Sequence, residues 1–125
     1  MNTISVVKEA QYLFADMLKY SVRVVELNAN HICALVKSGK TTWGELGFIR
    51  EDVDKRLWQA KVRAAKGHYA DMSEPLCSVS TVECLAGSIH ALVKSGKIPW
   101  KELGFTAKDV AEQLEQAKAR AQVDA

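Results

Sequence analysis

The sequence predicts an all-α protein, and three observations carry this prediction. The chain of 125 residues has only two prolines and is rich in Ala, Glu, Lys, Gln and Leu, which form helices readily. Apolar residues recur every three or four positions along most of the chain, which is the period of an amphipathic helix. One segment is also written twice. We therefore expect an internally duplicated unit of helix, turn, short helix, turn and helix, packed as a pseudo-twofold helical bundle with an extra N-terminal helix.

The repeat relates residues 21–64 to residues 78–121 at a constant offset of 57 positions, without a gap. Identical residues occupy 26 of the 44 aligned positions, and the clearest match is KSGKTTWGELGF, from Lys37, against KSGKIPWKELGF, from Lys94. Self-similarity at a fixed period indicates a duplicated supersecondary unit. We expect one domain over residues 1–125, made of an N-terminal helix (1–20), a first repeat (21–64), a linker (65–77) and a second repeat (78–121).

Apolar stripes at spacings of three and four residues predict the long helices and their core-facing sides. In the N-terminal helix the stripe consists of Val6, Ala10, Leu13, Phe14 and Met17. The first long helix of the repeats carries Val22, Val25, Ala29, Ile32 and Val36, matched by Val79, Val82, Ala86, Ile89 and Val93. The second carries Val53, Leu57, Ala60 and Ala64, matched by Val110, Leu114, Ala117 and Ala121.

Glycines divide each repeat into its elements. We expect Gly39 and Gly96 to take the left-handed conformation that ends the first long helix, because glycine adopts it without a steric penalty. Gly47 and Gly104 are expected to end the short helix in the same way. Between the repeats, Gly67 marks residues 65–77 as a connector rather than a core helix.

The short helix between the glycines has its own start signal. Thr42 followed by Glu45 has the spacing of a capping box, and Pro99 stands at the equivalent place in the second repeat, where a first helical turn tolerates it. Trp43 and Trp100 open the short helices. We expect these tryptophans to fill the elbow between two antiparallel helices.

Composition limits the classes of function. The formal net charge of +2 is too small to require a nucleic-acid partner, and no apolar run of about 18 residues is present that would span a membrane. Three cysteines without a Cys-x-x-Cys pair favour free thiols in a reducing compartment. The first residues lack the basic leader and apolar run of a signal peptide. We expect a cytoplasmic protein.

Two segments resemble nucleotide-binding or DNA-binding motifs in part. ALVKSGKT has Ala34 where a phosphate-binding loop needs its first glycine, and a helix precedes it where that loop needs a strand. LGFTAKDVAEQL, residues 103–114, resembles the turn and second helix of a helix-turn-helix, but Trp100 stands where that motif needs a small residue. If nucleic acid is bound through this helix or its counterpart, the candidate contacts are Arg50, Lys55, Arg56 and Lys108.

Candidates for metal binding and catalysis are few. Cys33, Cys84 and His90 are weak candidates for a shared metal site, against the alternative of structural thiols and a structural histidine. Cys84 aligns with Leu27, which predicts a small buried side chain. The chain shows no set of nucleophile, base and acid and no paired carboxylates. We therefore expect no enzymatic activity, no cofactor and no small-molecule substrate.

The favoured hypothesis is a non-catalytic helical interaction protein, an adaptor, regulator or assembly subunit that binds a protein partner or forms a homodimer. Trp58 aligns with Glu115, so the fold does not require an aromatic residue there. The N-terminal helix either covers Trp58 or leaves it to a partner, where tryptophan is a frequent hot spot. Further candidate contacts are Lys37, Lys40, Lys94 and Lys97. The alternatives are a nucleic-acid-binding regulator that uses these KSGK loops or a divergent helix-turn-helix, and a small metal-binding protein or enzyme.

Overall fold

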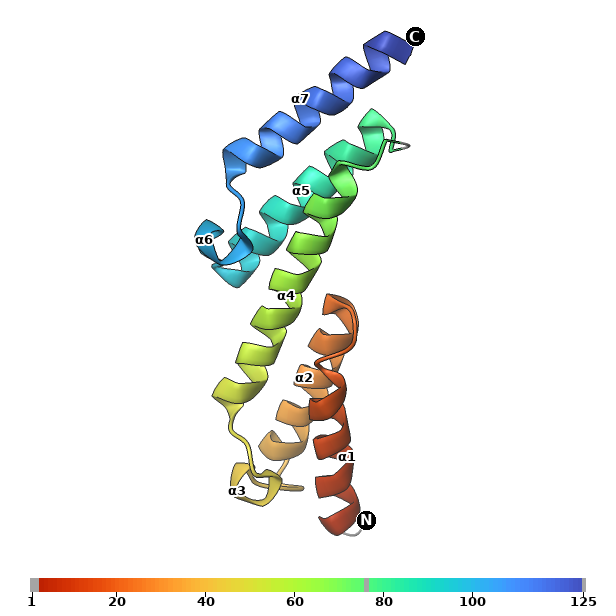
Figure 1. The fold of residues 1–125 in the computed structure, drawn as a ribbon. Coiled ribbons are helices and arrows are strands. Elements are labelled where there is room, and N and C mark those ends of the chain that lie inside the picture. Colours follow the sequence, from red (N-terminus) through yellow and green to blue (C-terminus); the bar gives the residue numbers. More distant parts are fainter. Residues whose placement is uncertain (1–2, 76, 125) are drawn as a thin grey trace. The chain divides into compact units, whose positions relative to one another are not determined.

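The computed structural model describes residues 3–75 and 77–124, and within these ranges it contains seven α-helices and no strand. The helices are α1 (Thr3–Asp16), α2 (Val22–Lys37), α3 (Trp43–Leu46), α4 (Arg50–Met72), α5 (Val79–Gly96), α6 (Trp100–Leu103) and α7 (Ala107–Asp124) (Figure 1). The prediction of an all-α protein is confirmed. None of the described helices is both long and apolar enough to cross a membrane.

The chain divides into two compact units, Met1–Ala60 (unit 1) and Lys61–Ala125 (unit 2). The division falls inside α4, so the first part of this helix belongs to unit 1 and the last part to unit 2. Unit 1 also contains α1, α2 and α3, and unit 2 contains α5, α6 and α7. Each unit has its own apolar core.

The core of unit 1 consists largely of the predicted stripes. Helix α1 packs against α2 and α3. The buried residues of this core are Val6, Ala10, Met17, Val25, Ala29, Ile32, Leu35, Leu46, Val53 and Ala60. Helix α1 ends at Asp16, before the predicted end at residue 20, because the amides of residues 17–19 bond to carbonyls only three positions back and turn the chain toward α2. The first two residues of the predicted helix lie outside the described ranges.

The core of unit 2 is built in the same manner, with α5 packed against α7. Its buried residues are Ala65, Met72, Val82, Ala86, Ile89, Ile98, Leu103, Phe105, Val110 and Ala117. Ala121, expected in the stripe of the last helix, is exposed. Its counterpart Ala64 is half-buried because α4 continues past it into a second core, whereas α7 ends at Asp124.

The elbows of the two units have the same geometry. In unit 1 the rings of Trp43 and Phe48 meet edge to face, with centroids 6.1 Å apart and planes at 64°. Trp100 and Phe105 repeat both values in unit 2. In each unit the leucine that ends the short helix is buried, and the glycine after it has φ of 83°. The tryptophans fill the elbows as predicted.

Thr42 and Pro99, which were predicted to start the short helices, are in place. Thr42 caps α3, since its Oγ1 accepts a hydrogen bond of 3.2 Å from the amide of Glu45. Pro99 is the N-cap of α6. At the start of α7 the amide of Asp109 donates to Thr106 Oγ1, and the Asp109 carboxylate accepts from the amide of Thr106 at 2.9 Å. This reciprocal pair satisfies two amides that the helix leaves unpaired.

The end of α5 corrects one prediction. Gly39 is left-handed after α2, with φ of 81°, but α5 runs through Gly96, and the left-handed residue is Lys97, with φ of 51°. The shift by one residue places Ile98 directly after the turn, where its side chain is buried over the helix end. A Cβ atom on Gly96 would lie 3.0 Å from Ile98 Cγ1. Gly96 therefore has a φ that is not positive and little room for a Cβ atom beside the side chains of Ile98 and Lys61.

Most of the predicted linker, residues 65–77, is helical, which corrects a second prediction. Helix α4 continues through Gly67 to Met72, and the connection to α5 begins only after that residue; position 76 lies outside the described ranges. Ala65 and Met72 are fully buried in unit 2. Burial of these side chains outweighs the helix penalty of one exposed glycine, which is about 1 kcal/mol.

In unit 2 the last part of α4 takes the structural role that α1 has in unit 1. Ala10 and Met17 of α1 are fully buried, and so are Ala65 and Met72, which follow at an offset of 55 positions. The connection from Met72 to the N-cap of α5 is two residues longer than the connection from Met17 to the N-cap of α2. An alignment at a constant offset of 57 therefore misses this correspondence.

Candidate functional site

The lysines of the KSGK segments lie at the ends of α2 and α5, one pair in each unit. All four are exposed: Lys37, Lys40, Lys94 and Lys97. None of them forms an ion pair with a described carboxylate. Each pair is placed where a positive charge interacts favourably with the C-terminal end of a helix.

Trp58 is half-buried on the first part of α4. Its neighbour Leu57 packs against the core of unit 1, whereas Trp58 is not among the described residues that do so. The tryptophan is thus neither a core residue of unit 1 nor a fully exposed one. Contact with a partner stays a prediction for this side chain.

The described residues contain no group of three His, Cys, Asp or Glu side chains that could hold a metal ion. Cys33 is half-buried in unit 1, whereas Cys84 and His90 are exposed in unit 2. The expectation that Cys84 is buried is wrong, because its counterpart Leu27 also lies outside the buried stripe. His90 has a structural contact, edge to face with Trp100 at 5.5 Å between ring centroids.

A helix-turn-helix is not formed at residues 103–114. The helix before the turn, α6, has four residues, and the motif needs a full helix that crosses the recognition helix. Of the candidate nucleic-acid contacts, Lys108 is exposed on α7, and Arg50 lies 4.0 Å from the carboxylate of Asp54 on the same helix. These cations are therefore not gathered in a recognition helix.

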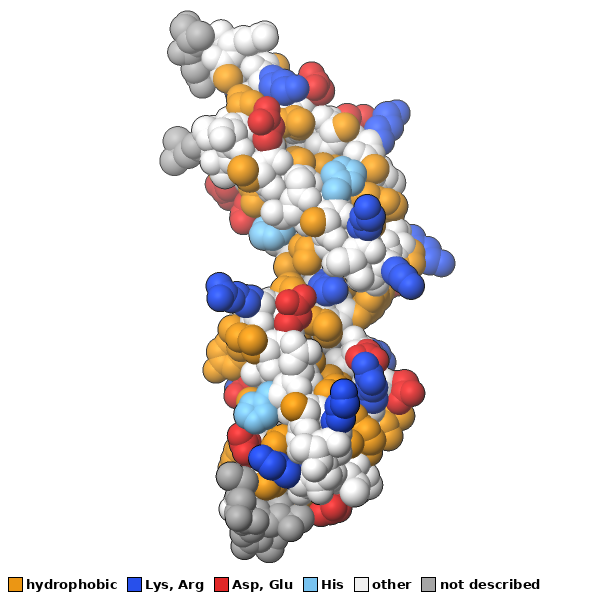
Figure 2. All heavy atoms as spheres, turned by 180° about the vertical axis from the view of Figure 1, so that it is seen from behind, with side chains coloured by type: hydrophobic (Ala, Val, Ile, Leu, Met, Phe, Trp, Pro, Cys, Tyr) orange, Lys and Arg blue, Asp and Glu red, His pale blue; other side chains and the backbone are white. Residues whose placement is uncertain are grey.

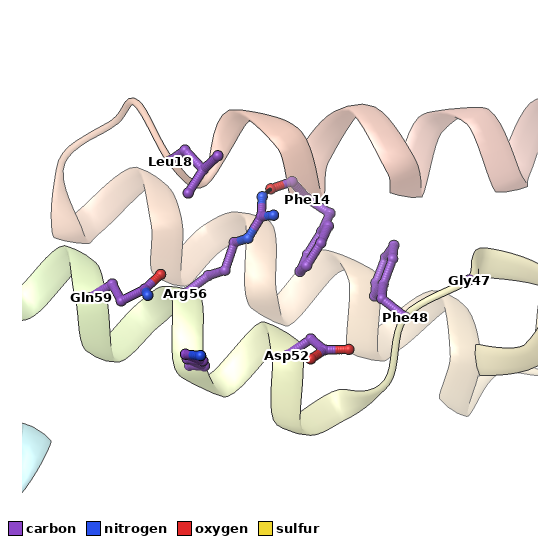
Figure 3. A pocket seen from close by; sticks show the side chains of 8 residues that line it. Phe14, Leu18, Gly47, Phe48, Asp52, Arg56 and Gln59 are labelled. Atoms are coloured by element: carbon purple, nitrogen blue, oxygen red, sulfur yellow. Dashed lines mark hydrogen bonds between the residues drawn. The ribbon is translucent and has the colours of Figure 1, made fainter.

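Lys55 and Arg56 meet in a groove of unit 1 that the sequence does not reveal. The groove has a volume of about 480 Å³, is open to solvent and lies between α1, the turn after α3 and α4 (Figure 3). It is lined by Phe14, Leu18, Gly47, Phe48, Asp52, Lys55, Arg56 and Gln59. We call it the α1–α4 groove.

Arg56 is held in this groove by α1. Its guanidinium carbon lies 3.8 Å from the ring centroid of Phe14, and Nη1 donates a hydrogen bond of 2.7 Å to the Phe14 carbonyl oxygen. The ring of Phe14 also stacks on the ring of Phe48, which lines the same groove (Figure 3). A ring and a carbonyl position the guanidinium, so its charge is fixed without a carboxylate partner.

The two other charged residues that line the groove are Lys55 and Asp52. Lys55 is exposed and forms no ion pair within the described ranges. Asp52 Oδ2 accepts a hydrogen bond of 3.0 Å from the amide of Ile49, and none of the described residues donates to Oδ1. Figure 3 shows Asp52 beside Phe48, on the opposite side of Arg56 from Gln59. The groove is therefore lined by two cations, Lys55 and Arg56, and by one carboxylate, that of Asp52.

Unit 2 keeps the rings of this site but not its cations. Tyr69 stacks on Phe105 as Phe14 stacks on Phe48. The positions of Lys55 and Arg56 are occupied by Glu112 and Gln113. Stacked rings are thus common to both units, and the two adjacent cations are a property of unit 1 that its fold does not require.

Large exposed apolar side chains also distinguish the two units. Among the described residues of unit 2 only Val123 is of this kind. Unit 1 exposes five, which we call the apolar surface of unit 1: Tyr12, Leu18, Tyr20, Leu27 and Ile49. Their counterparts in unit 2 are smaller or less apolar: Gly67, Ser73, Pro75, Cys84 and Thr106.

Tyr12 and Leu27 have the most exposed of these side chains in unit 1, at 71% and 61%. They lie on α1 and α2, which pack against each other and are joined by a hydrogen bond of 3.2 Å from Asn28 Nδ2 to the carbonyl of Leu13. Figure 2 shows hydrophobic side chains at several places on the surface, interspersed with charged ones. Exposed apolar residues that form a contiguous patch are typical of interaction surfaces.

No protein-family model, no curated protein and no solved structure matches this chain. The α1–α4 groove and the apolar surface of unit 1 are therefore the observations that bear on function.

Proposed function

We propose that the chain is a non-catalytic interaction protein. It binds another protein, or a second copy of itself, through the exposed residues of α1 and α2. The proposal is carried by the unequal distribution of exposed apolar side chains between two units of the same element order. The cytoplasmic location expected from the free cysteines stays a prediction.

Comparing the two units distinguishes residues that the fold requires from residues that are available for binding. Unit 2 forms its helices with Gly67 and Cys84 where unit 1 has Tyr12 and Leu27. The large apolar side chains are therefore not required by the helices that carry them. Tyrosine offers a rigid apolar area with one polar tip, which is favourable at the centre of a protein interface.

We further propose that the two units derive from one duplicated unit and pack about a pseudo-twofold axis. The identical residues of the repeat and the equal elbow geometry support the duplication. In this view unit 2 keeps the structural residues of the repeat, and unit 1 has acquired the binding surface.

A photo-crosslinking experiment tests the proposed function. Benzoylphenylalanine is introduced at Tyr12 or, as the matched control, at the exposed Gly67, where an added Cβ atom meets no atom within 4 Å. Irradiation in the native cells is expected to give one discrete adduct from position 12 and none from position 67. Leu27→Ser in the same chain should remove the adduct, since it removes the most exposed large apolar side chain of the helix that packs against α1.

Mass spectrometry of the adduct identifies a second copy of the chain or a different polypeptide, and both support the proposal. Absence of an adduct at position 12, or the same adducts from both positions, contradicts it.

The nucleic-acid alternative has less support. Arg50 lies beside Asp54, Arg56 is engaged by Phe14, and the helix preceding the recognition helix is too short. Lys55 and Lys108 are the candidates that keep a free charge. A regulator of nucleic acid would need more phosphate contacts than these two residues provide.

A further inference from the structure

We infer that the α1–α4 groove binds an acidic segment of the protein partner, with a carboxylate side chain between Lys55 and Arg56. The inference rests on the proposed function and names the chemical class of the partner. It starts from the two adjacent cations of the groove, neither of which has a carboxylate partner in the described ranges.

Arg56 is prepared for such a ligand. Its hydrogen bond to the Phe14 carbonyl uses one of the five N–H donors of the guanidinium, and the ring beneath it fixes the plane of the group. Free donors on a fixed guanidinium favour a carboxylate, which can accept two parallel hydrogen bonds. Because the side chain is already ordered, binding costs little additional conformational entropy.

The size and the walls of the groove fit a short peptide segment. Its volume of about 480 Å³ lies in the usual range of ligand sites, which is roughly 300–1,000 Å³. Phe14, Phe48 and Leu18 provide apolar surface beside the cations. Leu18 lines the groove and is exposed, so it offers apolar area to a segment bound there.

The carboxylates of unit 1 favour a single anionic side chain over a polyanion. Asp52 lines the same groove, and Glu51 and Asp54 are exposed on the same turns of α4. A nucleic-acid backbone would bring successive phosphates near these groups, and like charges in an interface oppose binding. A peptide places one carboxylate near Lys55 and Arg56 and can donate a backbone N–H to Oδ1 of Asp52.

The corresponding residues of unit 2 supply the variants for a test. Lys55→Glu introduces the residue found at position 112, and Lys55 is exposed without an ion pair, so the fold of unit 1 is retained. Lys101→Glu changes the net charge by the same amount at an exposed lysine outside the groove. Circular dichroism of both variants verifies that the helices are intact.

The measurement is fluorescence anisotropy of the full chain with a labelled peptide of alternating Glu and Leu, and with the same peptide containing Gln for Glu. At about 50 mM salt, where charge interactions are weakly screened, micromolar binding of the acidic peptide is expected. The Gln peptide, and the Lys55→Glu chain with the acidic peptide, should bind about tenfold more weakly. The Lys101→Glu chain should bind the acidic peptide like the unchanged protein.

Three results overturn the inference: equal binding of both peptides, equal losses for Lys55→Glu and Lys101→Glu, or tighter binding of a mixed-sequence duplex at the same salt. The crosslinking experiment keeps the two proposals distinct. An adduct at position 12 without peptide binding refutes the acidic segment alone. Peptide binding without an adduct refutes the interface on α1 and α2 and leaves the groove as an anion site.

Discussion

Phe14 stacks on Phe48 with ring centroids 3.9 Å apart and planes inclined by 10°. Tyr69 stacks on Phe105 in almost the same way, at 4.0 Å and 11°. Phe14 belongs to α1, whereas Tyr69 belongs to the last part of α4. Two helices that are far apart in the sequence therefore support the elbows of their units by the same contact.

The stacked pair predicts the effect of removing one ring. Phe14→Ala should lower the free energy of unfolding by about 3 kcal/mol, because it removes the stacking on Phe48 and the surface under Arg56. Tyr69→Phe should change it by less than about 0.5 kcal/mol, since unit 1 uses phenylalanine at this place. Urea denaturation followed by circular dichroism measures both. A neutral Phe14→Ala would falsify the supporting role of the ring.

Helix α4 predicts the effect of a side chain at position 67. Gly67→Ala should raise the free energy of unfolding by about 1 kcal/mol, because alanine is the better helix former and a Cβ there meets no atom within 4 Å. Gly47→Ala is the control and should lower it by about 1 kcal/mol or more, because Gly47 has φ of 83°. Thermal unfolding of the two variants distinguishes them. A neutral Gly67→Ala would indicate a flexible linker.

The left-handed Lys97 predicts a stabilising substitution. Lys97→Gly should raise the free energy of unfolding by about 0.5–1 kcal/mol, because φ of 51° is unfavourable for a residue with a Cβ atom. Gly39→Ala, the control at the end of α2, should lower it. Chemical denaturation is the measurement. If Lys97→Gly proves destabilising, Lys97 does not have the left-handed conformation in solution.

A buried hydroxyl predicts a second stabilising substitution. Thr41 is 2% exposed, its Oγ1 has no hydrogen-bond partner, and its counterpart in unit 2 is the buried Ile98. Thr41→Val keeps the shape and should raise the free energy of unfolding by about 1 kcal/mol. Thr42→Val, the adjacent control, should lower it by about 1 kcal/mol, since Thr42 caps α3. Opposite shifts of the midpoint of thermal unfolding support this view; equal shifts contradict it.

Local patterns predicted much of the fold but little of the candidate site. The stripe that contains Val25 and Ile32 was predicted correctly, because a helix that faces a core needs apolar residues at its own period. Cys84 was misjudged, because burial was inferred from residue type rather than from the period: at about 100° per residue, Leu27 and Cys84 lie opposite the apolar stripes of their helices, and both are exposed.

The sequence by itself determined the presence and order of the helices, the left-handed glycines after the short helices and the cap at Thr42, because each depends on residues within one or two turns of chain. Only the tertiary structure decided that α4 continues through Gly67, where the burial of Ala65 and Met72 outweighs a local helix penalty. It also decided the α1–α4 groove, which needs the contact of Arg56 with Phe14. These residues are 42 positions apart, and no pattern of neighbouring residues encodes a contact at that distance.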